Sequence, residues 1–188
     1  MKSKFVLKSL AVVAGVLAAC PAMAADAQQA APAKPAVKLY AKTFGSWVYR
    51  CNDAGQQAVC QVEQEMGVSR DGHMVPIAMV AFSKPVGQDH YDISAVVPLG
   101  ILLSAGVRFS ADQREAVEKS VDFCERDGCV VLPQPAGSLT TAFRSGKTGH
   151  LIFKLINGHP FTINFSLAGL NDAMKAFDKG ELPPPVKG

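Results

Sequence analysis

The sequence lacks the features that mark several large classes of protein. It contains no long run of Lys or Arg, and its 19 basic and 16 acidic side chains leave a formal charge of only +3. Three of the lysines, Lys2, Lys4 and Lys8, lie near the start, so the rest of the chain has as many basic as acidic side chains. A neutral chain has no global electric field that would attract nucleic acid or an anionic membrane. We therefore expect no nucleic-acid partner.

The sequence also lacks the short motifs of common catalytic sites. No Gly-x-Ser-x-Gly segment occurs, and Gly146-Lys147-Thr148 matches only the end of a phosphate-binding loop, because Thr141 stands where that loop requires a glycine. The histidines are scattered, and each is better explained as a turn or surface residue than as a catalytic base. They are His73, His90, His150 and His159. We expect no catalytic residue, no cofactor and no enzymatic activity.

What the sequence does contain begins with an export signal. Met1 to Ser9 is positively charged, Leu10 to Ala19 is apolar but too short to span a bilayer, and Ala22-Met23-Ala24 is a small-residue cleavage site. We predict a signal peptide over residues 1–24, a mature protein without a transmembrane segment, and a periplasmic or secreted location. The alternative is a lipoprotein, because Leu17-Ala-Ala-Cys20 resembles the motif that precedes a lipidated cysteine. Cys20 would then become a membrane-anchored N-terminus.

Composition divides the rest of the chain into one domain between two tails. Residues 25–38 are rich in Ala, Gln and Pro and have no apolar period, which predicts a disordered leader. Residues 39–180 have globular patterning and are too few for two comfortable domains. Residues 181–188 contain three consecutive prolines, which cannot continue a helix, and we predict a disordered tail.

Four cysteines remain in the domain whichever way Cys20 is processed. An even number of cysteines in an exported protein predicts disulfides. We favour the pairs Cys51 with Cys60 and Cys124 with Cys129, because each pair brackets a turn-like stretch, although three pairings are possible. A four-cysteine zinc site is the alternative, but the spacings are poor for zinc and its thiolates do not suit an oxidising compartment.

Alternating apolar and polar residues predict strands along most of the domain. We expect strands over residues 43–51, 58–64, 76–82, 91–97 and 129–132, a loop over 66–75, a buried crossing segment over 98–107, and a turn near Asp112 followed by a strand into Cys124. Three residues of the expected loop, Met66, His73 and Met74, could bind a soft metal. Solvation of the loop is the commoner explanation of such side chains, and we expect no metal.

The clearest hairpin lies near the end of the domain. A three-residue loop, Ile156-Asn157-Gly158, with Gly158 in the left-handed region, would pair Phe153 with Phe161 and Leu151 with Ile163. A two-residue turn would instead place polar residues opposite apolar ones. The parity of the apolar positions therefore predicts the register of this hairpin.

Two short helices complete the expected fold. Residues 138–145 form the first, with Ser138 as its N-cap. The second follows the hairpin, has apolar residues at helical spacing, ends at Gly180 and would cover one open end or edge of the strands. Those apolar residues are Leu170, Ala173, Met174 and Phe177. Together these elements predict a mainly β fold, an antiparallel β-sandwich of Ig-like or jelly-roll-like type with one or two short helices, including a C-terminal helix.

Trp47 and Tyr49 allow two interpretations. Aromatic residues on a strand usually lie in the core, and Trp47 beside a disulfide would pack against it. The same two side chains could instead form an exposed patch that binds a partner. The sequence alone does not choose between these roles.

Several motifs resemble the invasion-associated locus B family, in the family's order and from about Phe44 to Phe177. Ser46 stands where the family more often has an acidic residue before the tryptophan. The resemblance implies a secreted or periplasmic β-sandwich of Gram-negative bacteria, named for a role in host-cell invasion, without catalytic residues to transfer. The motifs are Phe44-Gly-Ser-Trp-x-x-x-Cys51, Cys60-Gln61, Pro98-Leu-Gly-Ile-Leu-Leu-x-x-Gly106, Cys124-x-x-x-Gly-Cys129 and Ser166-Leu-x-Gly-Leu-x-x-Ala173.

Two hypotheses about function follow from these observations. The first is an exported, non-enzymatic interaction protein of the bacterial envelope, which binds an envelope or host protein through a sheet face or edge and, by resemblance, contributes to host interaction or virulence. The alternative is a hydrolase of envelope polymers, which needs paired carboxylates. Asp122, Glu125 and Asp127 beside the second cysteine pair are the only candidates, and they are more simply explained as a solvated turn.

Overall fold

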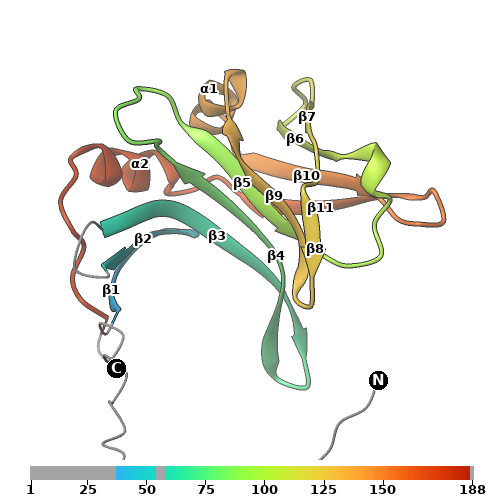
Figure 1. Cartoon of the computed structure of the whole chain (residues 1–188), viewed down its shortest axis with the longest axis horizontal. Helices are drawn as coiled ribbons and strands as arrows, with labels where there is room; N and C mark the ends of the chain where they lie inside the picture. The colour runs from blue at the N-terminus through green and yellow to red at the C-terminus, as the bar shows by residue number, and fades with distance from the viewer. Residues whose placement is uncertain (1–36, 54–57, 187–188) are drawn as a thin grey trace, which may run out of the picture. The chain divides into compact units, whose positions relative to one another are not determined.

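A computed structural model describes residues 37–53 and 58–186 of the chain. The predicted signal peptide, the alternative of a lipidated Cys20 and residues 25–36 of the leader lie outside the described residues. Within the described part, two antiparallel sheets form the domain together with two short helices (Figure 1). The prediction of a mainly β fold with antiparallel sheets and a C-terminal helix is confirmed.

The larger sheet has seven strands in the order β1-β2-β3-β4-β5-β9-β8, and the smaller has four in the order β11-β10-β6-β7. The strands of the larger sheet are β1 (Lys38–Phe44), β2 (Trp47–Asp53), β3 (Ala58–Arg70), β4 (His73–Ser83), β5 (Asp92–Val97), β8 (Phe123–Glu125) and β9 (Gly128–Pro135). Those of the smaller sheet are β6 (Val107–Ala111), β7 (Val117–Lys119), β10 (Thr148–Lys154) and β11 (Pro160–Ser166). The helices are α1 (Ser138–Ser145) and α2 (Leu170–Asp178), with a short 3-10 turn at Leu103–Ala105.

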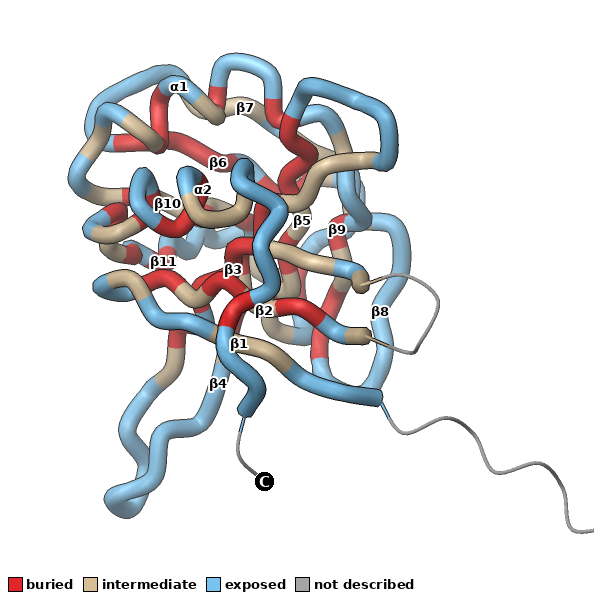
Figure 2. The backbone as a smooth tube through the Cα atoms, turned by 90° about the vertical axis from the view of Figure 1, so that its left-hand side faces the viewer, coloured by how far each residue is buried: buried red, intermediate tan, exposed pale blue. Residues whose placement is uncertain are grey.

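The core lies between the two sheets, because alternate residues of their strands point inward. In β2, for example, Trp47, Tyr49 and Cys51 are buried, whereas Val48 and Arg50 between them are only half-buried. Buried residues gather in the middle of the domain, and the tip of the β3–β4 hairpin is exposed (Figure 2). The buried apolar residues of the other elements include Val62, Val80, Phe82, Ile93, Val97, Phe109, Leu139, Phe143, Leu151, Ile163, Phe165, Leu170 and Met174.

The hairpin of β10 and β11 has the predicted register. Leu151 pairs with Ile163 and Phe153 with Phe161. The amide of Leu155 donates to the carbonyl of His159 at 2.9 Å, which leaves a three-residue loop, and Gly158 has φ +83°. The parity argument and the left-handed glycine are both confirmed.

The single strand predicted over residues 43–51 is wrong. The chain turns at Gly45 and Ser46, and Phe44 of β1 pairs with Trp47 of β2. Gly45 has φ +59°, and a Cβ there would lie 2.6 Å from the carbonyl oxygen of Ala168. The turn therefore depends on a close approach by a distant segment, which local strand propensity does not reveal.

The loop predicted over residues 66–75 is also wrong. β3 and β4 continue as a paired hairpin to a tight turn at Asp71 and Gly72, both with positive φ. Beyond Met66 this hairpin projects past the core as an arm, where both faces of the strands meet solvent (Figure 2). Without a core to cover, its residues lose the apolar alternation that normally reveals a strand.

Two further predictions need correction between β5 and β9. In the crossing segment over 98–107, Ile101 and Val107 are buried, but Leu99 is 53% exposed and the 3-10 turn has no buried residue. The turn at Asp112 is confirmed, with φ +51°. The strand predicted from it into Cys124 is instead two three-residue strands, β7 and β8, which belong to different sheets.

The N-terminus of α1 and the C-terminal segment of the chain differ from the prediction. α1 has the predicted bounds, but Gly137 is its N-cap residue and no side chain caps it, so Ser138 does not have the predicted role. Glu181 to Val186, predicted to belong to a disordered tail, lies along β1 instead. The amide of Ala41 donates to Pro184 and that of Val186 to Leu39, at 3.0 and 2.8 Å. We call residues 181–186 the C-terminal strap.

Candidate functional site

Trp47 and Tyr49 are core residues, with exposed fractions of 0% and 2%. The indole Nε1 of Trp47 donates to the carbonyl of Ser166 at 3.0 Å, so Trp47 of the larger sheet is hydrogen-bonded to β11 of the smaller. The hydroxyl of Tyr49 donates to the carbonyl of Glu181 at 3.1 Å, and burial raises the pKa of this tyrosine. An exposed binding patch at these residues is therefore wrong, because both rings point between the sheet and the elements that cover it.

Two glycine-containing motifs that are far apart in the sequence meet at this place. The amide of Ser46 donates to the carbonyl of Ala168 at 3.1 Å. A Cβ on Gly169 would lie 1.9 Å from the carbonyl oxygen of Phe44, and Gly169 has φ +92°. The Phe-Gly-Ser-Trp segment and the Ser-Leu-x-Gly-Leu segment therefore form one structural unit, in which glycine permits backbone-to-backbone contact.

The four cysteines form two disulfides, Cys51–Cys60 and Cys124–Cys129. This is the pairing favoured from the sequence, and it leaves no thiolate for the zinc alternative. Each disulfide joins residues directly opposite one another on neighbouring strands, β2 with β3 and β8 with β9. The first lies partly in the core, whereas the second closes an exposed hairpin at the sheet edge.

The acidic residues of the hydrolase hypothesis have different environments. A carboxylate oxygen of Asp122 accepts the amide of Leu132 at 2.8 Å, so this side chain holds β9 beside the segment before β8. Glu125 and Asp127 are exposed near the hairpin turn. Among residues 37–53 and 58–186, no group of three or more His, Cys, Asp or Glu side chains could hold a metal ion.

The histidines and the methionines proposed as metal ligands are dispersed. His150 Nδ1 lies 2.7 Å from an oxygen of Asn164, and His90 Nε2 lies 3.3 Å from Asp92 Oδ1. Met66 is buried on β3, whereas His73 and Met74 are exposed at the far end of the arm. The three residues that could have bound a soft metal are therefore not brought together.

The outer face of the larger sheet carries an apolar row that sequence reasoning missed. Register places Met79 opposite Val96, Val96 opposite Val130, and Val130 opposite Phe123, and directly paired residues share a face. We call these four residues the outer apolar row. The residues on either side of Met79, Val96 and Val130 are buried, so strand alternation turns these three side chains to the other face of the sheet. Phe123 is 42% exposed, and the other three are half-buried.

The signal for this row was present in the sequence but ambiguous. The segment Pro76-Ile-Ala-Met-Val-Ala-Phe82 is apolar at both alternating sets of positions. Such a pattern is typical of a strand covered on both sides, and it does not say which side lacks a cover. In the structure Ile77 and Met79 of the second set are half-buried, whereas Ala81 of the same set is buried. Only the pairing of β4 with β5, and of β5 with β9, places Met79 in the row.

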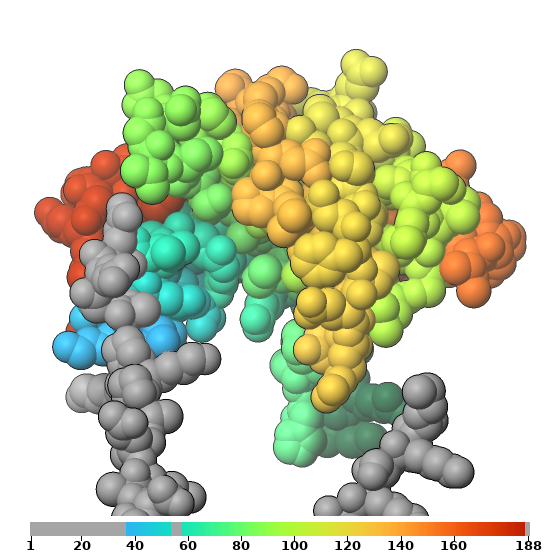
Figure 3. Space-filling view, in the orientation of Figure 1, coloured from blue at the N-terminus to red at the C-terminus, as the bar shows by residue number. Residues whose placement is uncertain are grey.

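The outer apolar row borders a groove of about 350 Å³ between the β3–β4 arm and the β8–β9 turn. Glu65 of β3 and Asp127 of the turn line it from strands on either side of β4. The arm and the β8–β9 hairpin project to the same side of the domain (Figure 3). The apolar lining is Val75, Pro76, Ile77, Ala78, Met79 and Val96. An apolar groove with carboxylates at its rim matches a segment that carries apolar and basic side chains.

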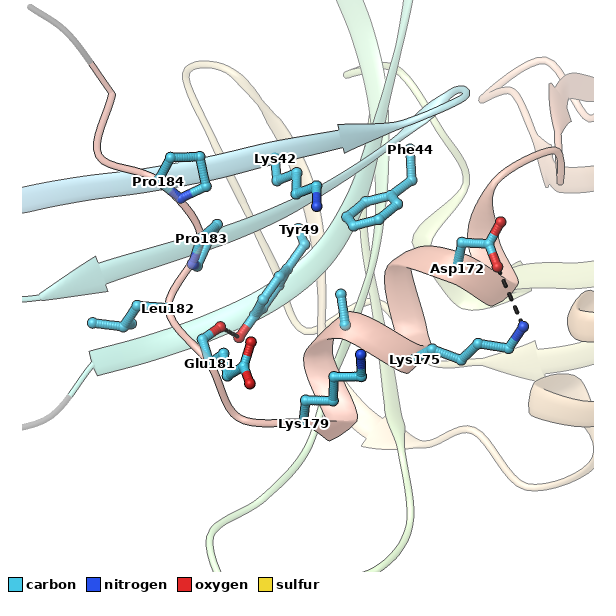
Figure 4. A pocket seen from close by; sticks show the side chains of 11 residues that line it. Lys42, Phe44, Tyr49, Asp172, Lys175, Lys179, Glu181, Leu182, Pro183 and Pro184 are labelled. Atoms are coloured by element: carbon cyan, nitrogen blue, oxygen red, sulfur yellow. Dashed lines mark hydrogen bonds and ion pairs between the residues drawn. The ribbon is translucent and has the colours of Figure 1, made fainter.

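A second pocket, also of about 350 Å³, lies between β1, α2 and the C-terminal strap (Figure 4). Lys42 and Lys179 point into it from opposite sides, with the ring of Tyr49 between them (Figure 4). The charged residues that line it are Lys42, Lys175, Lys179, Asp172 and Glu181. Because the carboxylates offset the lysines, this pocket has no strong charge that would favour an anionic ligand.

A wider hollow of about 750 Å³ lies at the other side of the strap. Asp178 Oδ1 there accepts hydrogen bonds from Lys84 Nζ at 2.6 Å and from the Tyr91 hydroxyl at 2.5 Å. Burial alone would raise the pKa of the Asp178 carboxyl, but these two donors outweigh it and hold the pKa below its usual range. Burial and the Asp178 carboxylate both raise the pKa of Tyr91. The polar groups satisfy one another, which is typical of a structural network.

The comparisons with known proteins agree with this geometry. Residues 47–178 match the model of the invasion associated locus B protein family. A search of curated proteins found no match. Among solved structures, the crystal structure of invasion associated protein b from Bartonella henselae is similar, with a TM-score of 0.63 and 23% identity, covering 74% of this chain and 98% of that one.

That structural likeness supports the fold, and the family match covers most of the chain. The matched residues include Trp47, which joins the two sheets, Gly169, which contacts the turn after β1, and both disulfides, which link neighbouring strands. No helix of the described residues is long and apolar enough to cross a membrane. The chain belongs to the invasion associated locus B protein family.

Proposed function

We propose that this protein is an exported, non-enzymatic interaction protein of the bacterial envelope, which binds a protein partner through the outer apolar row and the adjoining groove. The observation that supports the proposal is a row of four apolar side chains across β4, β5, β9 and β8, of which Phe123 is 42% exposed and the other three are half-buried. Contiguous apolar surface of this kind is typical of protein interaction sites.

The chemistry of the groove suggests what the partner offers. An apolar segment of the partner would fill the space beside Met79 and Val96, and a Lys or Arg on it would meet Glu65 or Asp127. Apolar contacts at the centre of an interface supply most of its affinity, whereas charges at the rim chiefly set orientation and association rate. We therefore expect Phe123 and Met79 to matter more for affinity than the two carboxylates.

The proposed cellular setting rests on the predicted export signal and on the disulfides. Two disulfides fit folding in an oxidising compartment, and we propose a periplasmic or secreted protein. The family is named for invasion, and the similar Bartonella henselae protein is described as invasion associated. We extend this to a contribution of the present protein to host-cell interaction, through an envelope or host protein as partner.

The test uses a photo-crosslinking amino acid on the proposed surface. It replaces Phe123 in one variant and Val86, which is exposed on the β4–β5 loop, in a matched control. Each oxidised domain is incubated with detergent-solubilised envelope or host-cell membranes and irradiated. We expect one protein to be crosslinked through position 123 and not through position 86.

Affinity for that protein then decides the role of the row. We expect Phe123→Ser to weaken binding at least tenfold, because it removes the aromatic ring and the most exposed side chain of the row, and Val86→Ser to leave binding unchanged. Equal binding by the two variants, or crosslinking through both positions, would show that the partner binds elsewhere. Release of sugar or peptide fragments from purified envelope polymer would instead favour the hydrolase.

A further inference from the structure

The four sheet edges of the described domain are protected to different degrees. Edge strands present unpaired backbone groups, which folded proteins usually cover, shorten or charge. The strap covers β1, where Tyr40 forms a bridge with Pro185. β7 and β8 are three residues long, and β7 carries Glu118 and Lys119. β11, the remaining edge, has none of these protections beyond Pro160 at its first position.

β11 has the composition of a strand that pairs readily. It contains seven residues, Pro160-Phe-Thr-Ile-Asn-Phe-Ser166, and none of them is charged. Aromatic and β-branched residues predominate in it, and these favour extended pairing. An uncharged strand can also lie beside a copy of itself without electrostatic repulsion. The composition thus makes β11 the edge of this domain that is best suited to strand addition.

Hydrogen bonding shows which backbone groups of β11 face outward. The hairpin closes with a hydrogen bond from Leu155 to His159, and Leu167 donates to Lys147 at the other end, at 2.9 Å each. In an antiparallel pair, residues alternate between bonding to the partner strand and facing away from it. Phe161, Ile163 and Phe165 therefore bond to β10. The backbone groups of Thr162 and Asn164 face away, and no described residue bonds to them there.

At each end of β11 one outward-facing backbone group is not available to a new strand. Pro160 has no amide hydrogen to donate. The carbonyl of Ser166, which also faces outward, already accepts the indole Nε1 of Trp47 at 3.0 Å. A strand that paired with β11 would therefore meet one missing donor and one occupied acceptor, at opposite ends of the row.

These features are complementary when β11 meets a second β11 in antiparallel orientation. We infer that two copies of this protein pair through β11, with Ile163 on the two-fold axis, so that Thr162 of each copy lies opposite Asn164 of the other. Thr162 and Asn164 then exchange amide and carbonyl bonds on both sides of the axis. Pro160 lies opposite Ser166, so the missing donor faces the acceptor that Trp47 already occupies. No outward group of β11 is left without a partner in this register.

The side chains of β11 are compatible with the same pairing. Phe161 is 45% exposed, and in this register it lies opposite Phe165 of the second copy, which would cover it. Thr162 and Asn164 face each other on the outer side as two uncharged polar residues. A two-fold interface requires a surface that complements itself, and an uncharged strand with this arrangement meets that requirement. The interface leaves the outer apolar row of the larger sheet free.

The experiment measures the mass of the oxidised mature protein by light scattering over a hundredfold range of concentration, together with amide exchange at single residues. We expect a concentration-dependent doubling of the mass. In the dimer the amides of Thr162 and Asn164 gain protection, whereas that of Ile163, already bonded to β10, changes little. Thr162→Pro removes an outward-facing donor and no hydrogen bond to β10, and we expect it to weaken association more than tenfold. Thr162→Ala keeps that donor and is the matched control.

Three results would overturn the inference. The first is a monomer at every concentration. The second is a dimer in which the amides of Thr162 and Asn164 exchange as fast as in the diluted protein, since the copies would then meet elsewhere. The third is equal association of Thr162→Pro and Thr162→Ala, with circular dichroism confirming that both fold. If Thr162→Pro does not fold, the exchange rates of the unaltered protein decide the matter alone.

Discussion

Gly169 has a backbone position that no other residue type can occupy without moving its surroundings. Its φ of +92° disfavours any side chain, and a Cβ would lie 1.9 Å from the carbonyl oxygen of Phe44. We expect Gly169→Ala to lower the free energy of unfolding by about 3 kcal/mol, because strain and backbone displacement add. Urea unfolding of the oxidised protein measures this change.

Gly158 supplies the matched control for this prediction. It also has a positive φ, +83°, but a Cβ there would meet nothing within 4 Å. Gly158→Ala should therefore cost only the conformational strain, about 1 kcal/mol. Equal losses for the two variants would mean that the approach of Phe44 to Gly169 is not close enough to constrain the fold.

Asp178 predicts how stability depends on pH. Its pKa is lowered in the folded state, so its stabilising effect is complete above the unfolded pKa, near 4, and is lost as the pH falls through the folded pKa. We expect Asp178→Asn to be less stable than the unaltered protein at pH 7. The difference should shrink steadily below about pH 4. Thermal unfolding between pH 2.5 and 7, in roughly half-unit steps, measures both curves.

Asp172 on the same helix is the control for Asp178. Its carboxylate is exposed and pairs with Lys175, three residues along α2, at 3.3 Å. A surface pair of this kind contributes little, so Asp172→Asn should change stability by less than about 0.5 kcal/mol at every pH. A shrinking difference in both variants would attribute the acid sensitivity to net charge and not to the Lys84–Asp178–Tyr91 network.

Among the elements, the C-terminal strap has the clearest testable role. It donates to and accepts from β1, buries Pro183 and accepts the Tyr49 hydroxyl. We expect a chain that stops after Gly180 to lose about 1 to 2 kcal/mol of stability, since hydrogen bonds and apolar burial are both removed. The amide of Ala41 should lose its exchange protection in that chain. A chain that stops after Val186 keeps the whole strap and is the control.

Loss of the strap also exposes a second sheet edge. β1 would then present its outward backbone groups, although Lys38 and Lys42 discourage pairing with another strand. If the truncated chain keeps the Ala41 protection and the stability of the control, the strap does not hold the β1 edge in solution.

The elements also show where sequence reasoning succeeds. The β10–β11 hairpin could be predicted in full, because the parity of its apolar residues and one glycine determine loop length and register together. α2 could be predicted because its apolar residues recur at helical spacing. Both elements depend on residues close in the chain. The division of the first strand at Gly45 and the path of the strap depend on contacts with distant segments, which no local pattern contains.

At the scale of the whole molecule, the sequence predicted the fold class and the pairing of the cysteines, but not the candidate binding surface. Met79, Val96, Val130 and Phe123 come from four strands, and three long-range pairings bring them into a row. In the sequence Met79, Val96 and Val130 are apolar residues among apolar neighbours, and Phe123 lies between Asp122 and Cys124. Which apolar residues of different strands become neighbours is a property of the topology, and no local pattern contains it.

The hydrogen bond from Trp47 to Ser166 makes the folding of this domain measurable by tryptophan fluorescence. Trp47 is the only tryptophan of the chain, and it lies fully buried where the larger sheet meets β11 of the smaller. Its ultraviolet emission should therefore shift when the two sheets come together and the ring leaves water. Trp47 is therefore an intrinsic fluorescence probe of that step, which stopped-flow measurements can follow without any added dye.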